Sequence, residues 1–123
     1  MFVSPRAAGW LRLRHRATGR TVLLINHHGP LPVNSGGKCG QEAAAAALLR
    51  LAGTRAYEGD AVVLAGDFNS ERTSELQRVL AGGLRRVVGN GLDAIFSSCP
   101  QASGRTLGRG GSDHEALGAT LTI

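Results

Sequence analysis

The stretch Ala61-Val62-Val63-Leu64-Ala65-Gly66-Asp67-Phe68-Asn69 decides how the chain is organised. Its small and apolar residues predict a buried strand, which runs directly into a carboxylate and a carboxamide. Because side chains alternate along an extended chain, Asp67 and Asn69 are expected on one side, with Phe68 turned into the packing. A carboxylate beside a carboxamide can orient a water molecule or hold a hard cation. The stretch therefore predicts a polar site where a buried strand ends.

The composition indicates one small globular domain with an anionic partner. The chain has 123 residues, 42% of them hydrophobic, and a formal charge of +5. Lys38 is the one lysine among 14 basic residues, and arginine forks suit phosphate and carboxylate groups, which indicates an anionic partner. A GC-rich coding sequence produces the same composition, and this alternative is at least as strong. No apolar run approaches the roughly 18 residues of a membrane-spanning helix, so no membrane partner is expected, and residues 1–12 show no signal-peptide pattern.

The two cysteines, Cys39 and Cys99, do not have the spacing of a metal site. Each lies beside glycine or proline, so a single disulfide is one alternative and two unpaired thiols are the other. The unpaired thiols are the preferred expectation.

Two strands of different exposure are expected ahead of the organising stretch. Apolar and basic residues alternate over Trp10–Arg16, which predicts a half-exposed strand, whereas Thr21–Ile25 is continuously apolar after its first residue, as in a central strand. A turn at Ala17–Arg20 would join them into a hairpin. Arg12 and the two arginines that follow it could face a phosphate backbone, but a charged edge strand that resists aggregation explains them equally well.

The second of these strands also ends in polar residues, Asn26-His27-His28. Asn26 and His28 share a side of an extended chain, and the following Gly29-Pro30 cannot continue the sheet. Two adjacent histidines cannot both face one site, and a single histidine is commonly structural. Of the two, His28 is the preferred site residue.

A helix between the two polar-ended strands would bring their ends to one edge of the sheet. A glycine- and serine-rich loop is expected at Val33–Gly40, followed by an alanine-rich helix over Gln41–Leu51 that ends at Gly53. Such a crossover makes the flanking strands parallel neighbours, and open sheets place ligands where the C-terminal ends of these strands meet.

A second helix and a second hairpin are expected further along the chain. The helix is predicted over residues 70–80, where Ser74 and Gln77 have the spacing of a capping box, although Ser70 or Thr73 could start the helix instead. Two short strands at Leu84–Val88 and Leu92–Phe96 follow, and the Asn-Gly pair between them favours a tight turn.

Asp93 lies inside the second of these strands and needs a partner, because an unpaired buried carboxylate costs several kcal/mol. Arg85 or Arg86 could supply a structural ion pair, and a histidine partner would make the residue functional. A long loop over Ser97–Gly111 leads to such a histidine in Ser112-Asp113-His114, before a last strand over residues 116–123. A carboxylate that fixes an imidazole is common in general-base and charge-stabilising sites.

Four motifs occur in a fixed order: Asn26-x-His28, Gly66-Asp67-Phe68-Asn69, Leu92-Asp93-x-Ile95-Phe96 and Ser112-Asp113-His114. In this order and context the chain resembles the endonuclease/exonuclease/phosphatase superfamily, which includes pancreatic deoxyribonuclease. The resemblance implies an α/β fold: half of a two-sheet α/β sandwich of the deoxyribonuclease-like type, with a mixed, mainly antiparallel sheet and two helices on one face.

The resemblance also implies roles for individual residues. Asp67 would orient or activate the attacking water, and Asn69 would hold a phosphate oxygen. His114 would be the base or the phosphate-stabilising imidazole, supported by Asp93. His28 would contact the phosphate or the leaving group, and the substrate-binding residue beside it would be Asn26.

The metal expected from the resemblance is Mg²⁺ or Mn²⁺, next to Asp113 and Asp67. Domains of this superfamily are about twice as long as this chain, and residues 1–123 correspond to the C-terminal half. The resemblance places the main metal-binding glutamate in the other half, and no glutamate precedes Asn26. The metal site is therefore expected to be incomplete, with one sheet face left open to association.

The favoured interpretation is a fragment of a divalent-metal-dependent phosphodiesterase, specifically an endonuclease acting on nucleic acid, that is inactive alone. Two alternatives stay open. The chain could be a half-domain that is active only with a complementary chain or as a homo-oligomer, or it could be a non-catalytic basic module that binds nucleic acid or protein.

Overall fold

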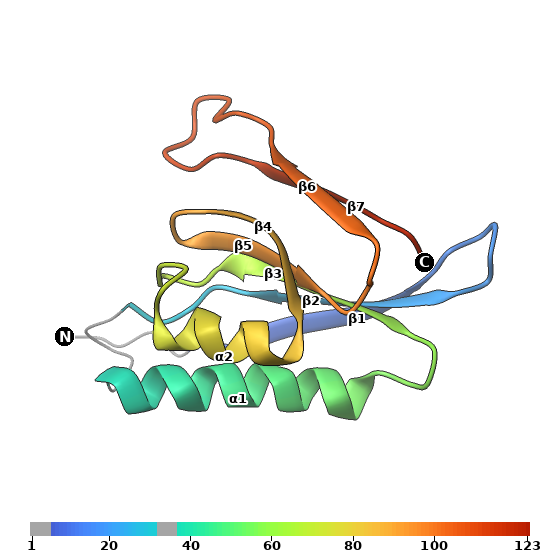
Figure 1. Cartoon of the computed structure of the whole chain (residues 1–123), viewed down its shortest axis with the longest axis horizontal. Helices are drawn as coiled ribbons and strands as arrows, with labels where there is room; N and C mark the ends of the chain where they lie inside the picture. Colours follow the sequence, from blue (N-terminus) through green and yellow to red (C-terminus); the bar gives the residue numbers. More distant parts are fainter. Residues whose placement is uncertain (1–5, 32–36) are drawn as a thin grey trace.

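The structure is a computed structural model that describes residues 6–31 and 37–123, with only the backbone described at residues 37–39. A five-stranded sheet carries two helices on one face (Figure 1). In spatial order the strands are β1 (Ala8–Arg14), β2 (Thr21–His27), β3 (Ala61–Asp67), β5 (Asp93–Ser97) and β4 (Arg85–Asn90). Strands β2 and β3 are parallel, and every other pair of neighbours in this sheet is antiparallel. This arrangement confirms the predicted mixed, mainly antiparallel sheet with both helices on one face.

The crossover helix α1 (Gly37–Arg55) is longer than predicted. It begins within the expected loop, whose residues 33–36 lie outside the described part of the chain. The helix also continues past Gly53, where the sequence predicted its end: no atom would lie within 4 Å of a Cβ there, and the Ala56 amide still donates to the Ala52 carbonyl. The chain instead reverses near Gly59, whose φ of +85° favours glycine.

The hydrophobic core lies between the helices and one face of the sheet. Leu23 and Ile25 from β2 and Leu64 from β3 are fully buried against α1 and α2 (Glu75–Gly83). Phe68 and Phe96 pack edge to face beside them, with ring centroids 5.7 Å apart. No helix in the described ranges is long and apolar enough to cross a membrane.

Helix α2 begins where the capping motif predicted. The Ser74 hydroxyl accepts a hydrogen bond from the Gln77 amide at 3.2 Å, which satisfies one of the free amides of the first turn. The preceding residues 70–73 are not helical, so the helix is shorter at its start than predicted.

A two-stranded sheet was not predicted. Strand β6 (Ala102–Thr106) pairs antiparallel with β7 (Leu117–Leu121), and the pair lies over β4 and β5 on the face opposite the helices (Figure 1). The prediction of a continuous loop over Ser97–Gly111 is therefore wrong. The sequence of β6 contains only one β-branched residue, so its own propensity is weak. Gly104 is required where β6 passes over Val88, because a Cβ at this position would lie 2.4 Å from the Val88 side chain.

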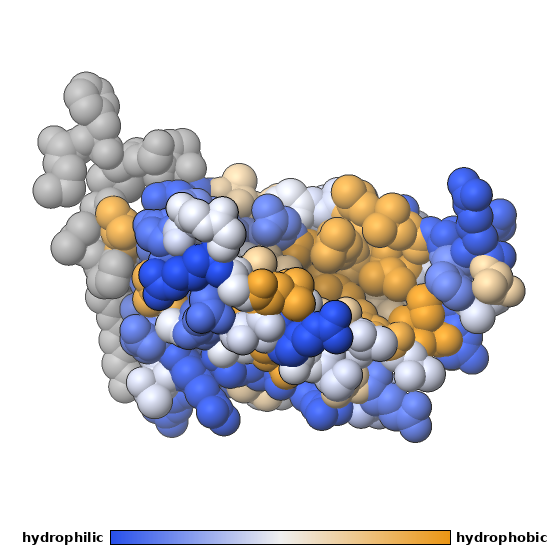
Figure 2. All heavy atoms as spheres, turned by 90° about the horizontal axis from the view of Figure 1, so that it is seen from above, coloured by the Kyte–Doolittle hydropathy of each residue, from blue (hydrophilic) through white to orange (hydrophobic). Residues whose placement is uncertain are grey.

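The rest of that sheet face is open over β1 and β2. Leu11 and Leu13 pair with Leu24 and Val22 on this face, and their exposed fractions are 48% and 51%. Figure 2 shows the resulting apolar hollow, viewed onto the open face. A groove of about 470 Å³ runs along it, lined chiefly by Leu13, Val22, Leu24 and Ile123. We call the four residues Leu11, Leu13, Val22 and Leu24 the open apolar face.

The arginines of β1 do not form one phosphate-binding row. Arg12 lies on the helix side of the sheet, where it donates two hydrogen bonds to the Asp60 carboxylate at 2.7 and 2.9 Å and stacks over Tyr57. The charge of Arg12 is neutralised by Asp60 within the fold. At this position the basic edge strand therefore has a structural role and does not face a phosphate backbone.

Candidate active site

The polar ends of β2 and β3 meet at one edge of the sheet because these strands are parallel. Asn26, the penultimate residue of β2, and His28, the first residue after it, are both exposed. Asp67 at the end of β3 is the direct antiparallel partner of Asp93 at the start of β5. Two carboxylates in this cross-strand position repel each other, so the pair favours a positively charged group between them.

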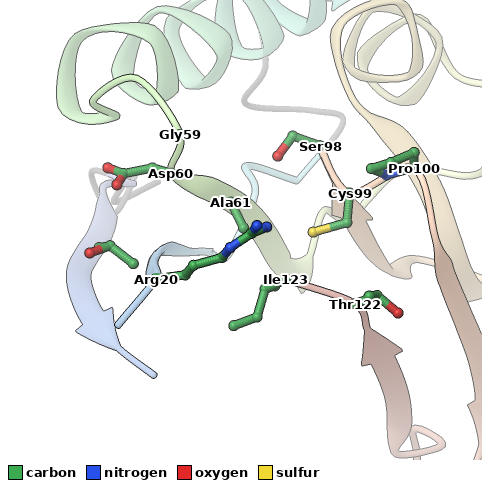
Figure 3. A pocket seen from close by; sticks show the side chains of 10 residues that line it. Arg20, Gly59, Asp60, Ala61, Ser98, Cys99, Pro100, Thr122 and Ile123 are labelled. Atoms are coloured by element: carbon green, nitrogen blue, oxygen red, sulfur yellow. The ribbon is translucent and has the colours of Figure 1, made fainter. Parts of the chain in front are cut away.

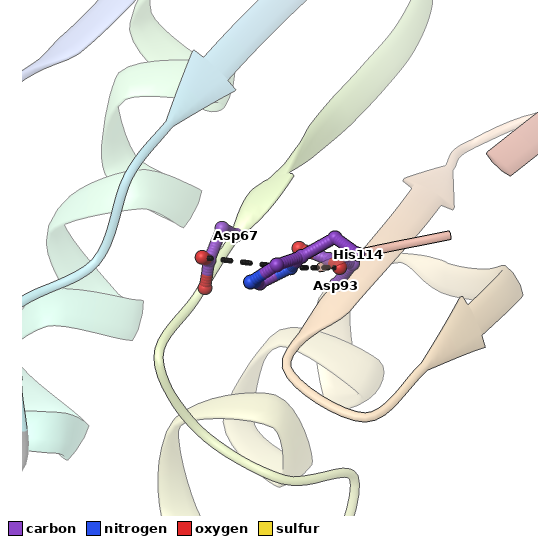
Figure 4. A group of neighbouring side chains, drawn as sticks. All are labelled: Asp67, Asp93 and His114. Carbon is purple, nitrogen blue, oxygen red and sulfur yellow. Dashed lines mark hydrogen bonds and ion pairs between the residues drawn. The ribbon is translucent and has the colours of Figure 1, made fainter. Parts of the chain in front are cut away.

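His114 supplies that group from the loop between β6 and β7. Its Nδ1 lies 2.7 Å from Asp93 Oδ2 and 4.0 Å from Asp67 Oδ2, so the ring stands between the two carboxylates (Figure 4). The hydrogen bond from the imidazole to Asp93, followed by the charge of that carboxylate, raises the pKa of His114 above its ordinary value. The Asp93 partner is thus a histidine. The alternative arginines are engaged elsewhere: Arg85 with the Pro100 carbonyl and Arg86 with the Gln77 side chain.

The structure separates the two adjacent histidines. His28 Nε2 lies 3.6 Å from Asp67 Oδ2, and its side chain is 59% exposed. His27 is buried in the core, where its Nδ1 donates to the Ala7 carbonyl, and burial lowers its pKa. Of these two adjacent histidines, only His28 lies at the polar edge of the sheet.

Asn69 reaches the edge by a different route from the one predicted. Its φ is +49°, so the chain turns after Asp67, and the expectation of a continued extended strand is wrong. The Asn69 amide donates to Asp67 Oδ1, and its side-chain Nδ2 donates to the Gly29 carbonyl, both at 2.8 Å. Through these two hydrogen bonds, Asn69 links the loop after β2 to the loop after β3. The second Nδ2 hydrogen has no partner among the described residues and can serve an anionic oxygen.

The cluster can hold a metal ion. Asp67, Asp93 and His114 each offer a ligand atom, and these atoms lie within 4.8 Å of one another. The two carboxylates suit a hard divalent cation, whereas His114 Nδ1 is already committed to Asp93 and fits better as a hydrogen-bond donor. Asp113, expected as a ligand, lies at the rim with its side chain 93% exposed and its Oδ2 4.0 Å from His114 Nε2. No glutamate of the described segments joins the group.

A separate pocket lies at the other end of β3. It has a volume of about 170 Å³, and Arg20, Asp60 and Cys99 are among its lining residues (Figure 3). Cys99 is buried and forms no disulfide within the described part of the chain, and the side chain of Cys39 lies outside that part. This pocket contains none of the residues that gather at the polar edge.

Comparison with known proteins identifies the fold of this chain. No family model matches the sequence, and no curated protein does. Among solved structures, an endonuclease/exonuclease/phosphatase protein from Bacteroides vulgatus aligns with a TM-score of 0.71 at 21% identity, over 95% of this chain and 56% of its own. The chain has the endonuclease/exonuclease/phosphatase fold. Its own topology, with helices on one sheet face only, agrees with part of such a domain.

Two further structures support the same assignment. The human Nocturnin catalytic domain, solved with a bound sulfate anion, aligns with a TM-score of 0.74 at 20% identity over 97% of this chain and 54% of its own. A Staphylococcus aureus beta toxin variant with bound magnesium ions aligns with a TM-score of 0.61 at 10% identity over 93% and 53%. The chain thus spans about half the length of the structures that it matches.

Proposed function

We propose that this chain, residues 1–123, contributes half of the active site of a divalent-metal-dependent phosphodiesterase that hydrolyses nucleic acid as an endonuclease. The observation that carries the proposal is the hydrogen bond between Asp93 and His114 beside Asp67, at the edge where the parallel strands end. The fold similarity to proteins described as endonuclease/exonuclease/phosphatase members supports the same reaction class.

We infer a part for each side chain of the cluster in phosphoester hydrolysis by water. Asp67 Oδ1 accepts the Asn69 amide, which leaves Oδ2 to face His28 and His114. From there Oδ2 would orient the attacking water and accept its proton. The second Nδ2 hydrogen of Asn69 would hold a phosphate oxygen, and His28 with Asn26 would contact the phosphate or the leaving group.

His114 would stabilise charge on the phosphoryl group. Its Nδ1 is bound to Asp93, so Nε2 is the free donor on the other side of the ring. The raised pKa favours the imidazolium form, whose Nε2–H can donate to a phosphoryl oxygen. A divalent ion such as Mg²⁺ or Mn²⁺ would be held by Asp67 and Asp93, with Asp113 at the rim, and when bound it would act as a Lewis acid on the phosphoryl oxygens.

A complementary half would complete the site. The open apolar face exposes side chains that normally pack against a second layer, and two-sheet sandwiches bury such faces against each other. We assign this face to a second sheet, supplied by another segment or chain, that also brings a further metal-binding carboxylate. A second copy of this chain would cover the face without supplying that carboxylate by the same pattern.

The test is magnesium-dependent cleavage of plasmid DNA and of a chromogenic phosphodiester by the purified chain, with and without a complementary half. We expect cleavage only when the halves are combined, and its loss in His114→Ala. Nucleic-acid binding without cleavage in the combined sample, unchanged in His114→Ala, would instead identify a non-catalytic basic module. Cleavage by the chain alone would show that the site needs no complement.

A further inference from the structure

Strand β1 leaves one edge of the five-stranded sheet unpaired. It is the first strand in the spatial order, and β2 is its one neighbour among the described strands. The His15 amide donates to the Arg20 carbonyl at 2.7 Å, so the odd-numbered residues of β1 exchange backbone hydrogen bonds with β2. The backbone amides and carbonyls of the even-numbered residues from Ala8 to Arg14 therefore point away from the sheet.

Strand β1 has little of the protection that edge strands usually carry. Proteins prevent edge-to-edge pairing with proline, bulges, very short strands or charged side chains. The structure describes all seven residues of β1, which include no proline and pair with β2 in an unshifted register. Asp60 neutralises Arg12, which leaves Arg14 at the end of the strand as its other charged residue. Because Trp10 and the leucines of β1 are exposed, this edge is suited to pairing with another strand.

One antiparallel register pairs the whole of β1 with a second copy of itself. Leu11 is the middle residue of the strand. When Leu11 faces its own copy across a twofold axis, every residue from Ala8 to Arg14 has an opposite partner. Even-numbered residues then face even-numbered ones, so their outward-pointing amides and carbonyls meet as hydrogen-bonded pairs.

The side chains of β1 also suit this register. The small residue Ala8 lies opposite the long side chain of Arg14 from the second copy, and Trp10 lies opposite Arg12. No arginine faces another arginine, and the guanidinium opposite the indole can make a cation–π contact. A shift by two residues in either direction leaves residues unpaired, and one of the two shifts places Arg12 opposite itself. Both the backbone and the charges of β1 therefore favour the register centred on Leu11.

We propose that two copies of this chain associate through their β1 edges, as an antiparallel pair about a twofold axis at Leu11, and so join their two five-stranded sheets into one. Cross-strand neighbours lie on the same face of a sheet, so the two open apolar faces become continuous on one side and the helices of both copies lie on the other. The open apolar faces stay available to a complementary half. The inference does not depend on the proposed hydrolysis.

The experiment cross-links the two copies in this register. In Leu11→Cys the two new thiols face each other in a non-hydrogen-bonded pair, whose Cα atoms lie about 4.5 Å apart, within the range that a disulfide spans. The variant is made in the full chain with Cys39→Ser, oxidised with diamide and analysed on a non-reducing gel. We expect most of the Leu11→Cys chain to form a covalent dimer. The wild-type chain should sediment with the mass of two copies at the same concentration.

Leu13→Cys in the same background is the matched control. Leu13 lies on the same sheet face and is 51% exposed, compared with 48% for Leu11. In the proposed register Leu13 faces Gly9 of the second copy, and the two Leu13 residues lie about 14 Å apart along the strands, too far for a disulfide. Leu13→Cys should therefore stay monomeric on the gel.

Two results would overturn the inference. Equal cross-linking of Leu11→Cys and Leu13→Cys would show that the copies associate through their open apolar faces and not through the β1 edges. A wild-type chain that sediments as a single copy, with no covalent dimer of Leu11→Cys, would show that the edge stays unpaired in solution. Circular dichroism checks that each variant is folded.

Discussion

Asp93 is expected to control the protonation of His114. The 2.7 Å hydrogen bond favours the imidazolium, so the pKa of His114 lies above its ordinary value. Asp93→Asn should lower this pKa towards about 6.5, as measured by NMR titration of the His114 ring in metal-free buffer. Glu58→Gln, which removes an exposed carboxylate that does not contact the cluster, is the control. An unchanged His114 pKa in Asp93→Asn would contradict the assignment.

The same pair makes a pH-dependent contribution to the free energy of unfolding. Because the folded-state pKa of His114 is raised, the contribution is complete below the unfolded pKa of about 6.5. It is lost as the pH rises through the raised folded-state value. The stability difference between the wild type and Asp93→Asn, measured by urea unfolding, should therefore shrink as the solution becomes more alkaline.

Gly66 is expected to be irreplaceable for steric reasons. A Cβ at this position would lie 1.8 Å from the His27 carbonyl oxygen on the neighbouring strand, so the two strand ends would have to separate. Gly66→Ala should lower the free energy of unfolding by roughly 3 kcal/mol and displace Asp67. Gly82→Ala is the control, because no atom lies within 4 Å of a Cβ there and the residue is helical. Equal urea midpoints for the two variants would refute the steric argument.

The sequence predicted which residues gather at the polar edge of the sheet, but it did not predict how they are arranged there. Strand ends and short motifs were enough to select Asp67, Asp93 and His114, because polar residues that follow apolar runs can be recognised in the linear sequence. The direct pairing of Asp67 with Asp93 was not visible, since it joins strands separated by a helix and a further strand. Nor was the left-handed turn at Asn69, which depends on a hydrogen bond to Gly29, forty residues away in sequence.

At the scale of elements, α2 is expected to hold the loop that follows β3. Gln77 is 1% exposed, donates to the Ser70 carbonyl at 2.6 Å and accepts from Arg86 Nε at 3.2 Å. Gln77→Ala would leave both groups unpaired and should cost about 2–3 kcal/mol of unfolding free energy. Ser74→Ala removes only the helix cap and should cost about 1 kcal/mol. Thermal or urea unfolding that ranks the two variants in the opposite order would contradict this role for Gln77.

Helices and strands were predictable where local pattern and tertiary packing agree. The cap of α2 is a local signal, so Ser74 was among the predicted starts beside Ser70 and Thr73, and the structure has the cap at Ser74. The strand β6 has no such signal, because Ala-Ser-Gly-Arg-Thr becomes a strand only through pairing with β7 and packing on β4. The end of α1 was predicted too early. A glycine at position 53 lowers the stability of the helix by only about 1 kcal/mol, and packing of the helix against the sheet offsets this loss.

At the scale of the whole molecule, the open apolar face is expected to govern association. Leu13 is half exposed at its centre, beside Val22 and Leu24 in the apolar groove. Burial of one leucine contributes about 1.5–3 kcal/mol, so Leu13→Glu should weaken binding of the complementary half at least tenfold, as measured by sedimentation or calorimetry. Ala46→Glu places the same charge on an exposed position of α1 and should leave binding unchanged. If Leu13→Glu bound the complement as tightly as Ala46→Glu, the second sheet would have to dock elsewhere, and the apolar groove would need another occupant.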